Sequence, residues 1–274
     1  MVAAPLGELF GHPFVVENRV TSGGTVATQQ VADSPADGHS LLMTFDTFAV
    51  NPFLFRNLKW DPLRDFAPVM QLCRYPQVLL VHPGLGVKTL AEFVALAKQK
   101  GGQLNYGSAG PASSSRLAYE LLKEVAGIDS VPVHYRGGGP AIQDLIAGQL
   151  QVMLIQGGGA IQQHVRSGKL TALAVSSPAR TRFYANVPAI AETYPGFESQ
   201  SWVALFAPAA TPRAVLERLH GALAGILSEA GVRERFESQG CELVGGTPEA
   251  LAQLVRQEQA KWGRIIREKN ITLE

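Results

Sequence analysis

The sequence predicts an α/β fold with largely parallel sheets. Short apolar runs of the length of a buried strand alternate along the chain with segments whose apolar residues recur at helical spacing. Glycine-rich turns separate most of these segments, and this alternation is typical of α/β architecture. The chain has 274 residues, which is enough for one large domain or two ordinary ones.

Each element is predicted by its own apolar pattern and end signals. The first helix has an apolar face and ends at Gly11. Thr89 opens a capping box at the start of another helix. Two more helices are predicted by the Thr-Pro pairs at 211–212 and 247–248, in which the threonine is the expected N-cap and the proline the first helical residue. Strands are expected at residues 14–17, 40–44, 69–73, 77–81, 104–106, 131–133, 151–155, 170–175 and 202–206. Helices are expected at residues 2–10, 26–32, 89–100, between 113 and 127, after 140, between 159 and 168, and from 211 and 247 onward.

Composition excludes several classes of function. The net charge is +1, with 24 basic and 23 acidic residues and no run of like charge, so we expect no nucleic-acid partner. No apolar run reaches the ~18–20 residues of a transmembrane helix. The histidines lack the spacing of a zinc site, so we expect no metal and no cofactor. Cys73 and Cys241 belong to no CxxC motif, and we expect two unconnected thiols, with a disulfide or a metal site as the alternative.

Glycine- and serine-rich turns follow several of the expected strands. They lie at residues 44–47, 107–115, 136–139 and 156–159. In a parallel sheet, ligands bind at the carboxyl ends of the strands beside helix N-termini, where free backbone N–H groups favour an anion. These turns therefore predict an uncharged, donor-rich binding site. The alternative is that Ser113 is an ordinary N-cap and the turns are simple connections.

The same serines raise the alternative of a hydrolase or transferase. It would use Ser108 or Ser113 as the nucleophile and His134 as the base. The sequence has no GxSxG elbow, no phosphate-binding GxxxxGK[ST] motif and no evident pair of catalytic carboxylates. We therefore expect a noncatalytic protein.

A set of short segments occurs along the whole chain in a characteristic order. They lie at residues 15–19 (VVENR), 36–42 (ADGHSLL), 65–69 (DFAPV), 104–110 (LNYGSAG), 135–138 (YRGG), 144–148 (DLIAG), 168–175 (GKLTALAV), 205–208 (LFAP) and 245–249 (GGTPE). Together they resemble the Bug-type extracytoplasmic solute receptors, which are the binding proteins of tripartite tricarboxylate transporters, and they match that family in the same order from about residue 1 to the C-terminus.

The resemblance implies a two-lobed, type II periplasmic-binding-protein-like fold and a monomeric receptor of the Venus-flytrap kind. One lobe would comprise residues 1–103 and 201–274, and the other residues 104–200. Such a receptor captures a small carboxylate (an organic acid, an amino acid or an aromatic acid) and delivers it to membrane permease subunits in the periplasm. The chain carries no signal peptide and starts within an expected helix, so we expect an N-terminal truncation that removes the first strand of the first lobe.

The resemblance and the turns together give the expected ligand-binding residues. These are Thr44, Asp46, Thr47, Ser108, Ala109, Gly110, Ser113, Ser114, Ser115, Tyr135, Gly137, Gln156 and Trp202. Two positions depart from the family's pattern. Asp46 would repel an anion or pair with a cationic group, and Gln156 stands where amino-acid-binding relatives often have an aspartate. Tyr135 and Trp202 have the alternative of being core residues. A sensory or interaction protein that binds no solute is a further alternative.

Overall fold

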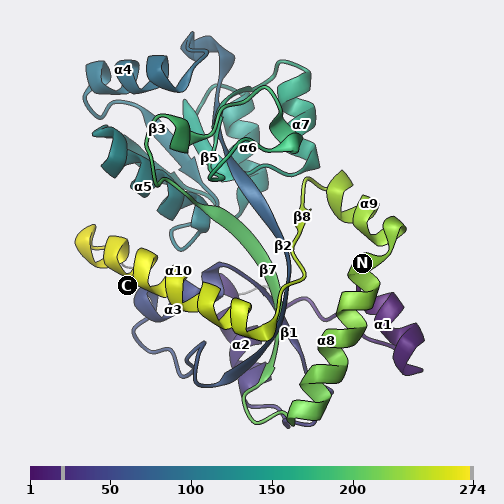
Figure 1. The fold of residues 1–274 in the computed structure, drawn as a ribbon. Coiled ribbons are helices and arrows are strands. Elements are labelled where there is room, and N and C mark those ends of the chain that lie inside the picture. Colours follow the sequence, from purple (N-terminus) through teal and green to yellow (C-terminus); the bar gives the residue numbers. More distant parts are fainter. Residues whose placement is uncertain (20–21, 272–274) are drawn as a thin grey trace. The chain divides into compact units, whose positions relative to one another are not determined.

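The computed structural model describes residues 1–19 and 22–271 and has an α/β fold (Figure 1). The chain divides into two compact units: unit 1 comprises residues 1–74 and 202–274, and unit 2 comprises residues 75–201. The strands β2 (Phe66–Val81) and β7 (Gln200–Pro208) carry the chain from one unit into the other. The first boundary therefore differs from the expected 103/104, because residues 77–81 of β2 pair with strands of unit 2.

In unit 1, helices flank a small antiparallel sheet. The strand β1 (Leu42–Phe45) pairs with β7, and the short β8 (Glu242–Leu243) pairs with β2. The helices of this unit are α1 (Ala3–Phe10), α2 (Thr25–Ala32), α3 (Thr47–Leu54), α8 (Arg213–Ser228), α9 (Ala230–Ser238) and α10 (Pro248–Glu268), with a short 3₁₀ turn η1 (Ser22–Gly24).

Aromatic rings form the centre of the unit 1 core. Phe48 stacks on Trp60 with their centroids 5.4 Å apart, and it meets Phe66 edge-on at 5.2 Å and Phe206 at 4.6 Å. The helix α10 packs along α3 (Figure 1), where Gly263 allows close approach, since an added Cβ would lie 2.9 Å from the Phe53 ring.

In unit 2, the sheet is mixed. The strand β3 (Asn105–Ser108) is parallel to β4 (Val131–His134) and to β5 (Val152–Gln156), while β2 is antiparallel to β5 and to β6 (Thr171–Val175). The helices are α4 (Leu90–Lys100), α5 (Ser114–Ala126), α6 (Gly138–Ile146) and α7 (Gly159–Arg166), with 3₁₀ turns η2 (Pro83–Leu85), η3 (Arg182–Tyr184) and η4 (Ile190–Glu192).

The α/β fold is confirmed, with three differences in its strands. The sheets are less parallel than expected, because β2 and β7 run opposite to the neighbours with which they pair. The strands expected at 69–73 and 77–81 are one continuous strand, β2. The strand expected at 14–17 is wrong: these residues form no strand, and Val15 and Val16 are exposed. An apolar run needs a neighbouring strand to become part of a sheet.

The expectation of two free thiols is also wrong. Cys73 and Cys241 form a disulfide with a Cα–Cα distance of 6.1 Å. The pairing of β2 with β8 explains it, because Cys73 lies opposite Leu243 and Arg74 opposite Glu242. Two Arg74–Glu242 hydrogen bonds, of 2.8 and 3.0 Å, join the strands beside the disulfide.

Candidate functional site

Three of the four glycine- and serine-rich turns follow strands of the unit 2 sheet. Because β3 is parallel to β4 and β5, with Ser108 opposite His134, the carboxyl ends of the three strands lie at one edge of the sheet. The chain continues from them into the N-termini of α5, α6 and α7, whose first-turn N–H groups have no partner within their helix. This edge collects the expected residues Ser108, Ala109, Gly110, Ser113, Ser114, Ser115, Tyr135, Gly137 and Gln156.

The loop between β3 and α5 is held by its own serines. Ser113 is the N-cap of α5 and accepts a hydrogen bond from the backbone N–H of Arg116. Its hydroxyl lies 2.7 Å from the Gly110 carbonyl and 2.8 Å from the Ser115 hydroxyl. The Ser115 hydroxyl accepts from the backbone N–H of Ala109 at 2.9 Å. The N-cap alternative is thus correct for Ser113, and the loop is also organised around its hydroxyl groups.

Glycine is required in this loop at Gly110, where φ is +145°. The loop is tied to the next turn, since the backbone N–H of Gly137 donates to the Ala109 carbonyl at 3.0 Å. The hydroxyl of Ser114 lies 3.2 Å from that of Ser201. The first two turns of the edge are therefore one connected structure.

His134 lies beside this loop, and its contact with Ser108 could not be read from spacing alone. The Ser108 hydroxyl is 2.7 Å from His134 Nδ1 and 3.1 Å from the Gly110 carbonyl oxygen. Burial and the nearby Arg116 guanidinium lower the pKa of His134 below its usual value of 6.5. Ser108 is fully buried, which does not suit a nucleophile that a substrate must reach. The signal in the sequence was that both residues follow closely on expected strands, at 104–106 and 131–133.

The other turns of the edge contain further polar contacts. The Tyr135 hydroxyl donates to the Asp144 carboxylate at 2.6 Å, and burial followed by this hydrogen bond raises the pKa of Tyr135 to about 12. Gln156 lies opposite Gln77 in the pairing of β5 with β2. Gln77 is buried and donates to the Ser199 hydroxyl at 3.3 Å. Asp144 and Gln77 were not among the expected site residues.

The remaining expected residues lie in unit 1. Thr44 is in β1, Asp46 follows that strand as the N-cap of α3, and Thr47 begins the helix. Trp202 comes just before Val203, which pairs with Phe45. Its ring is 2% exposed and belongs to the aromatic core of unit 1, so the core alternative describes its position. Asp46 is also buried.

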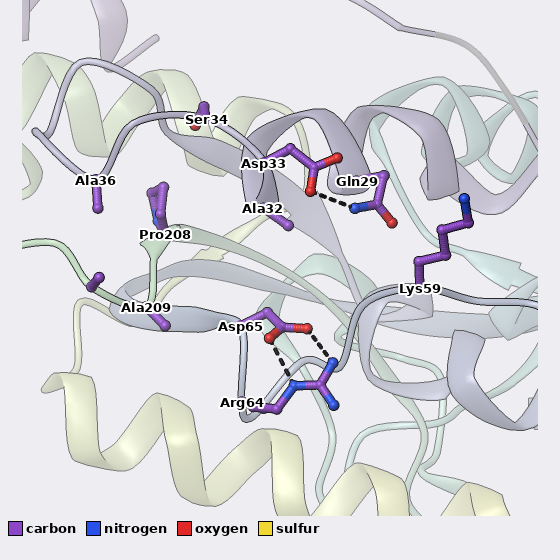
Figure 2. Close-up of a pocket in the computed structure, with 11 residues that line it drawn as sticks. Gln29, Ala32, Asp33, Ser34, Ala36, Lys59, Arg64, Asp65, Pro208 and Ala209 are labelled. Carbon is purple, nitrogen blue, oxygen red and sulfur yellow. Dashed lines mark hydrogen bonds and ion pairs between the residues drawn. The ribbon is translucent and has the colours of Figure 1, made fainter.

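Unit 1 contains a separate cavity of about 320 Å³ (Figure 2). Its lining includes none of the expected ligand-binding residues. Figure 2 shows two pairs within this lining: Arg64 is paired with Asp65, and Gln29 donates to Asp33. Such a lining gives no indication of a particular ligand.

The described part of the chain shows neither a metal centre nor a membrane-spanning helix. Residues 1–19 and 22–271 contain no group of three or more His, Cys, Asp or Glu side chains arranged to hold a metal ion. Over the same residues, the helices are too short or too polar to span a bilayer.

Comparisons with known proteins agree with the resemblance. The family model described as "Tripartite tricarboxylate transporter family receptor" matches residues 1–271. A "UPF0065 protein in tcbD-tcbE intergenic region" of Pseudomonas sp. (strain P51) is 34% identical over 97% of this chain and 80% of that protein. "Protein BugT" of Bordetella pertussis is 32% identical over 100% of this chain and 85% of that protein.

Solved structures give the same result. "R. palustris Rpa4515 with adipate" superposes with a TM-score of 0.89 at 30% identity, over 99% of this chain and 92% of that one. "MatC (Rpa3494) from Rhodopseudomonas palustris with bound malate" has a TM-score of 0.84 at 31% identity, over 97% and 92% of the two chains. The family match over nearly the whole chain, the identities of 30% or more and the superpositions have one explanation: this chain belongs to the receptor family of the tripartite tricarboxylate transporters, the Bug or TctC family of periplasmic solute receptors.

Proposed function

We propose that the protein is a noncatalytic receptor that binds a small carboxylate and delivers it to the permease subunits of a tripartite tricarboxylate-type transporter. The observation that supports it most is the donor-rich edge of unit 2, where three helix N-termini and a serine loop follow three parallel strands. The relatives bound to adipate and malate support dicarboxylic acids as the class of ligand.

A periplasmic location is part of the proposal. The Cys73–Cys241 disulfide supports it, because disulfides form and persist in oxidising compartments such as the bacterial periplasm. Family membership supports it independently.

Two residues of unit 1, Asp46 and Thr47, bear on which ligand the receptor selects. A buried carboxylate at Asp46 disfavours a second anionic group nearby and favours an ammonium or a ring N–H. We therefore propose that Asp46 and Thr47 contribute to the choice between dicarboxylates and amino acids. Asp46→Asn should shift the preference toward dicarboxylates, and isothermal titration with malate and with aspartate measures that preference.

The binding test uses thermal and chemical denaturation with adipate, malate and amino acids as probes. A ligand at 100 times its Kd adds about 2.7 kcal/mol to the free energy of unfolding. The informative variant is Ser114→Asp, which places a carboxylate at the first residue of α5. The charge favours the helix N-terminus but repels an anionic ligand, so stability should stay equal or rise while affinity falls at least tenfold.

A matched control is Ala230→Asp, which adds the same charge at the first residue of α9 in unit 1. Affinity should be unchanged in this variant. Equal affinity of the Ser114→Asp and wild-type proteins would contradict the assignment of the site. Turnover of an ester probe that disappears in Ser108→Ala would support the hydrolase alternative instead.

A further inference from the structure

The serine loop of unit 2 contains a continuous chain of hydrogen-bonding groups that begins at a histidine. His134 Nδ1 lies 2.7 Å from the Ser108 hydroxyl, which lies 3.1 Å from the Gly110 carbonyl oxygen. That oxygen is 2.7 Å from the Ser113 hydroxyl, which is 2.8 Å from the Ser115 hydroxyl. The histidine ring is therefore hydrogen-bonded to the segment that we propose to bind the ligand.

Each hydroxyl has one hydrogen to donate, whereas the Gly110 carbonyl oxygen can accept from two groups at once. Ser113 can therefore donate to that carbonyl whatever Ser108 does, but Ser108 has two acceptors for its single hydrogen, His134 Nδ1 and the Gly110 carbonyl. When His134 is neutral with its proton on Nε2, Ser108 donates to Nδ1.

Protonation of His134 reverses the hydrogen bond between the ring and Ser108. Nδ1–H now donates to the Ser108 oxygen, and the Ser108 hydroxyl donates to the Gly110 carbonyl. One proton has been taken from solvent, no covalent bond between heavy atoms has changed, and a positive charge now lies beside the serine loop.

We propose that His134 couples proton uptake to carboxylate binding, acting as a positioning residue through its hydrogen bond with Ser108 and through the positive charge that protonation places beside the serine loop. The proposal rests on the proposed function. Ser108 is fully buried between the ring and the loop, whereas His134 is exposed and can exchange its proton with solvent. A bound carboxylate would then favour the protonated ring, and the protonated ring would favour the carboxylate.

Burial and the charged groups around His134 set the sign of the effect. Burial of the ring is the largest influence and disfavours the protonated form, Arg116 of α5 adds to it, and Glu120 of α5 favours the protonated form. Arg136 follows closely in the sequence, and Asp144 of α6 accepts from the tyrosine between them. With its pKa below 6.5, the ring is mostly neutral at pH 7. A bound anion offsets Arg116 and raises that pKa, so affinity should rise as the pH falls through the region below 6.5.

The test is isothermal titration of adipate and of malate at several pH values between 5.5 and 8, with His134→Gln as the variant. Glutamine keeps a polar side chain but does not titrate. Between pH 8 and pH 5.5, the Kd should fall in both proteins or in the wild type alone. The fold-decrease in the wild type should be about ten times the fold-decrease in the variant. Any titration of the ligand itself is common to both proteins and cancels. His164→Gln, in α7 of the same unit, is the matched control and should behave as the wild type.

A second measurement needs no substitution at His134. In an NMR titration of the wild-type histidines, the pKa of His134 should rise when adipate is added, and that of His164 should not. Identical pH dependence in the wild type and His134→Gln, or an unmoved His134 pKa, overturns this inference and leaves the proposed function standing. Absence of binding of any tested carboxylate at every pH overturns both.

Discussion

The disulfide should supply a large part of the stability of unit 1. Removing it with the double substitution Cys73→Ala and Cys241→Ala leaves no polar group at two buried positions, which are 1% and 0% exposed. The neighbouring Arg74–Glu242 pair remains, but its side chains are 40% and 45% exposed, so it contributes only about 0–1 kcal/mol. The covalent link is therefore the main connection to be tested.

The magnitude follows from the loop that the disulfide closes. The two cysteines are 168 residues apart, and closing a loop of that length in an unfolded chain corresponds to about 5 kcal/mol. The loop contains all of unit 2. If unit 2 stays folded when unit 1 unfolds, its ends are already held together on the neighbouring strands β2 and β7. Only about 40 flexible residues then remain in the loop, and the loss becomes about 4 kcal/mol.

The assay is urea denaturation followed by two probes, with and without reductant. The three tryptophans, Trp60, Trp202 and Trp262, all lie in unit 1, so their fluorescence reports on that unit alone. Circular dichroism reports on both units. A loss of about 4 kcal/mol should be accompanied by a fluorescence transition that precedes the dichroism transition, and a loss of about 5 kcal/mol by coincident transitions. A variant within 1 kcal/mol of the oxidised wild type would refute the reasoning.

Two further predictions test packing and electrostatics. Gly157→Ala should lower the free energy of unfolding by about 1–3 kcal/mol, because the added Cβ would lie 2.5 Å from a Val78 methyl group. Gly139→Ala is the control, since its methyl group would meet nothing within 4 Å, and it should be neutral or slightly stabilising. Urea denaturation of the two variants measures the difference. Glu192 should titrate at about 2 by carbon NMR, since hydrogen bonds from Arg180 and a backbone N–H favour its charged form. The stabilising effect of the charged Glu192 is present above pH 4.5 and is lost as the pH falls toward 2. If the pKa of Glu192 stayed near 2 in the variant Arg180→Gln, the hydrogen bond with Arg180 would not be its main cause.

Much of the fold follows from local signals in the sequence. The capping residues Thr89 and Thr247 begin helices as expected. The hydroxyl of each accepts a hydrogen bond from the backbone N–H of the residue three positions later. Glycines that require a left-handed backbone end α4 at Gly101 and α5 at Gly127. Such signals act within a few residues, so a single sequence contains them in full.

What the sequence did not reveal depends on which strands become neighbours. The disulfide depends on β8 pairing with β2, and β8 is too short to be recognised from its apolar pattern. The strand at residues 14–17 was expected from composition, but composition contains no information about a partner strand. The Ser108–His134 contact similarly depends on the register between β3 and β4. Long-range pairing was therefore the missing information.

The division of the chain has a consequence for its synthesis. Unit 2 is one continuous segment, so all of it has been synthesised before residue 202 is added. Unit 1 needs both ends of the chain: the aromatic core around Phe48 includes Phe206, and α3 packs on α10. The apolar face of α3 must therefore wait for about 200 residues of translation before its partner helix exists. Unit 2 can complete its folding first, and the N-terminal part of unit 1 is the segment that most needs a chaperone during this interval.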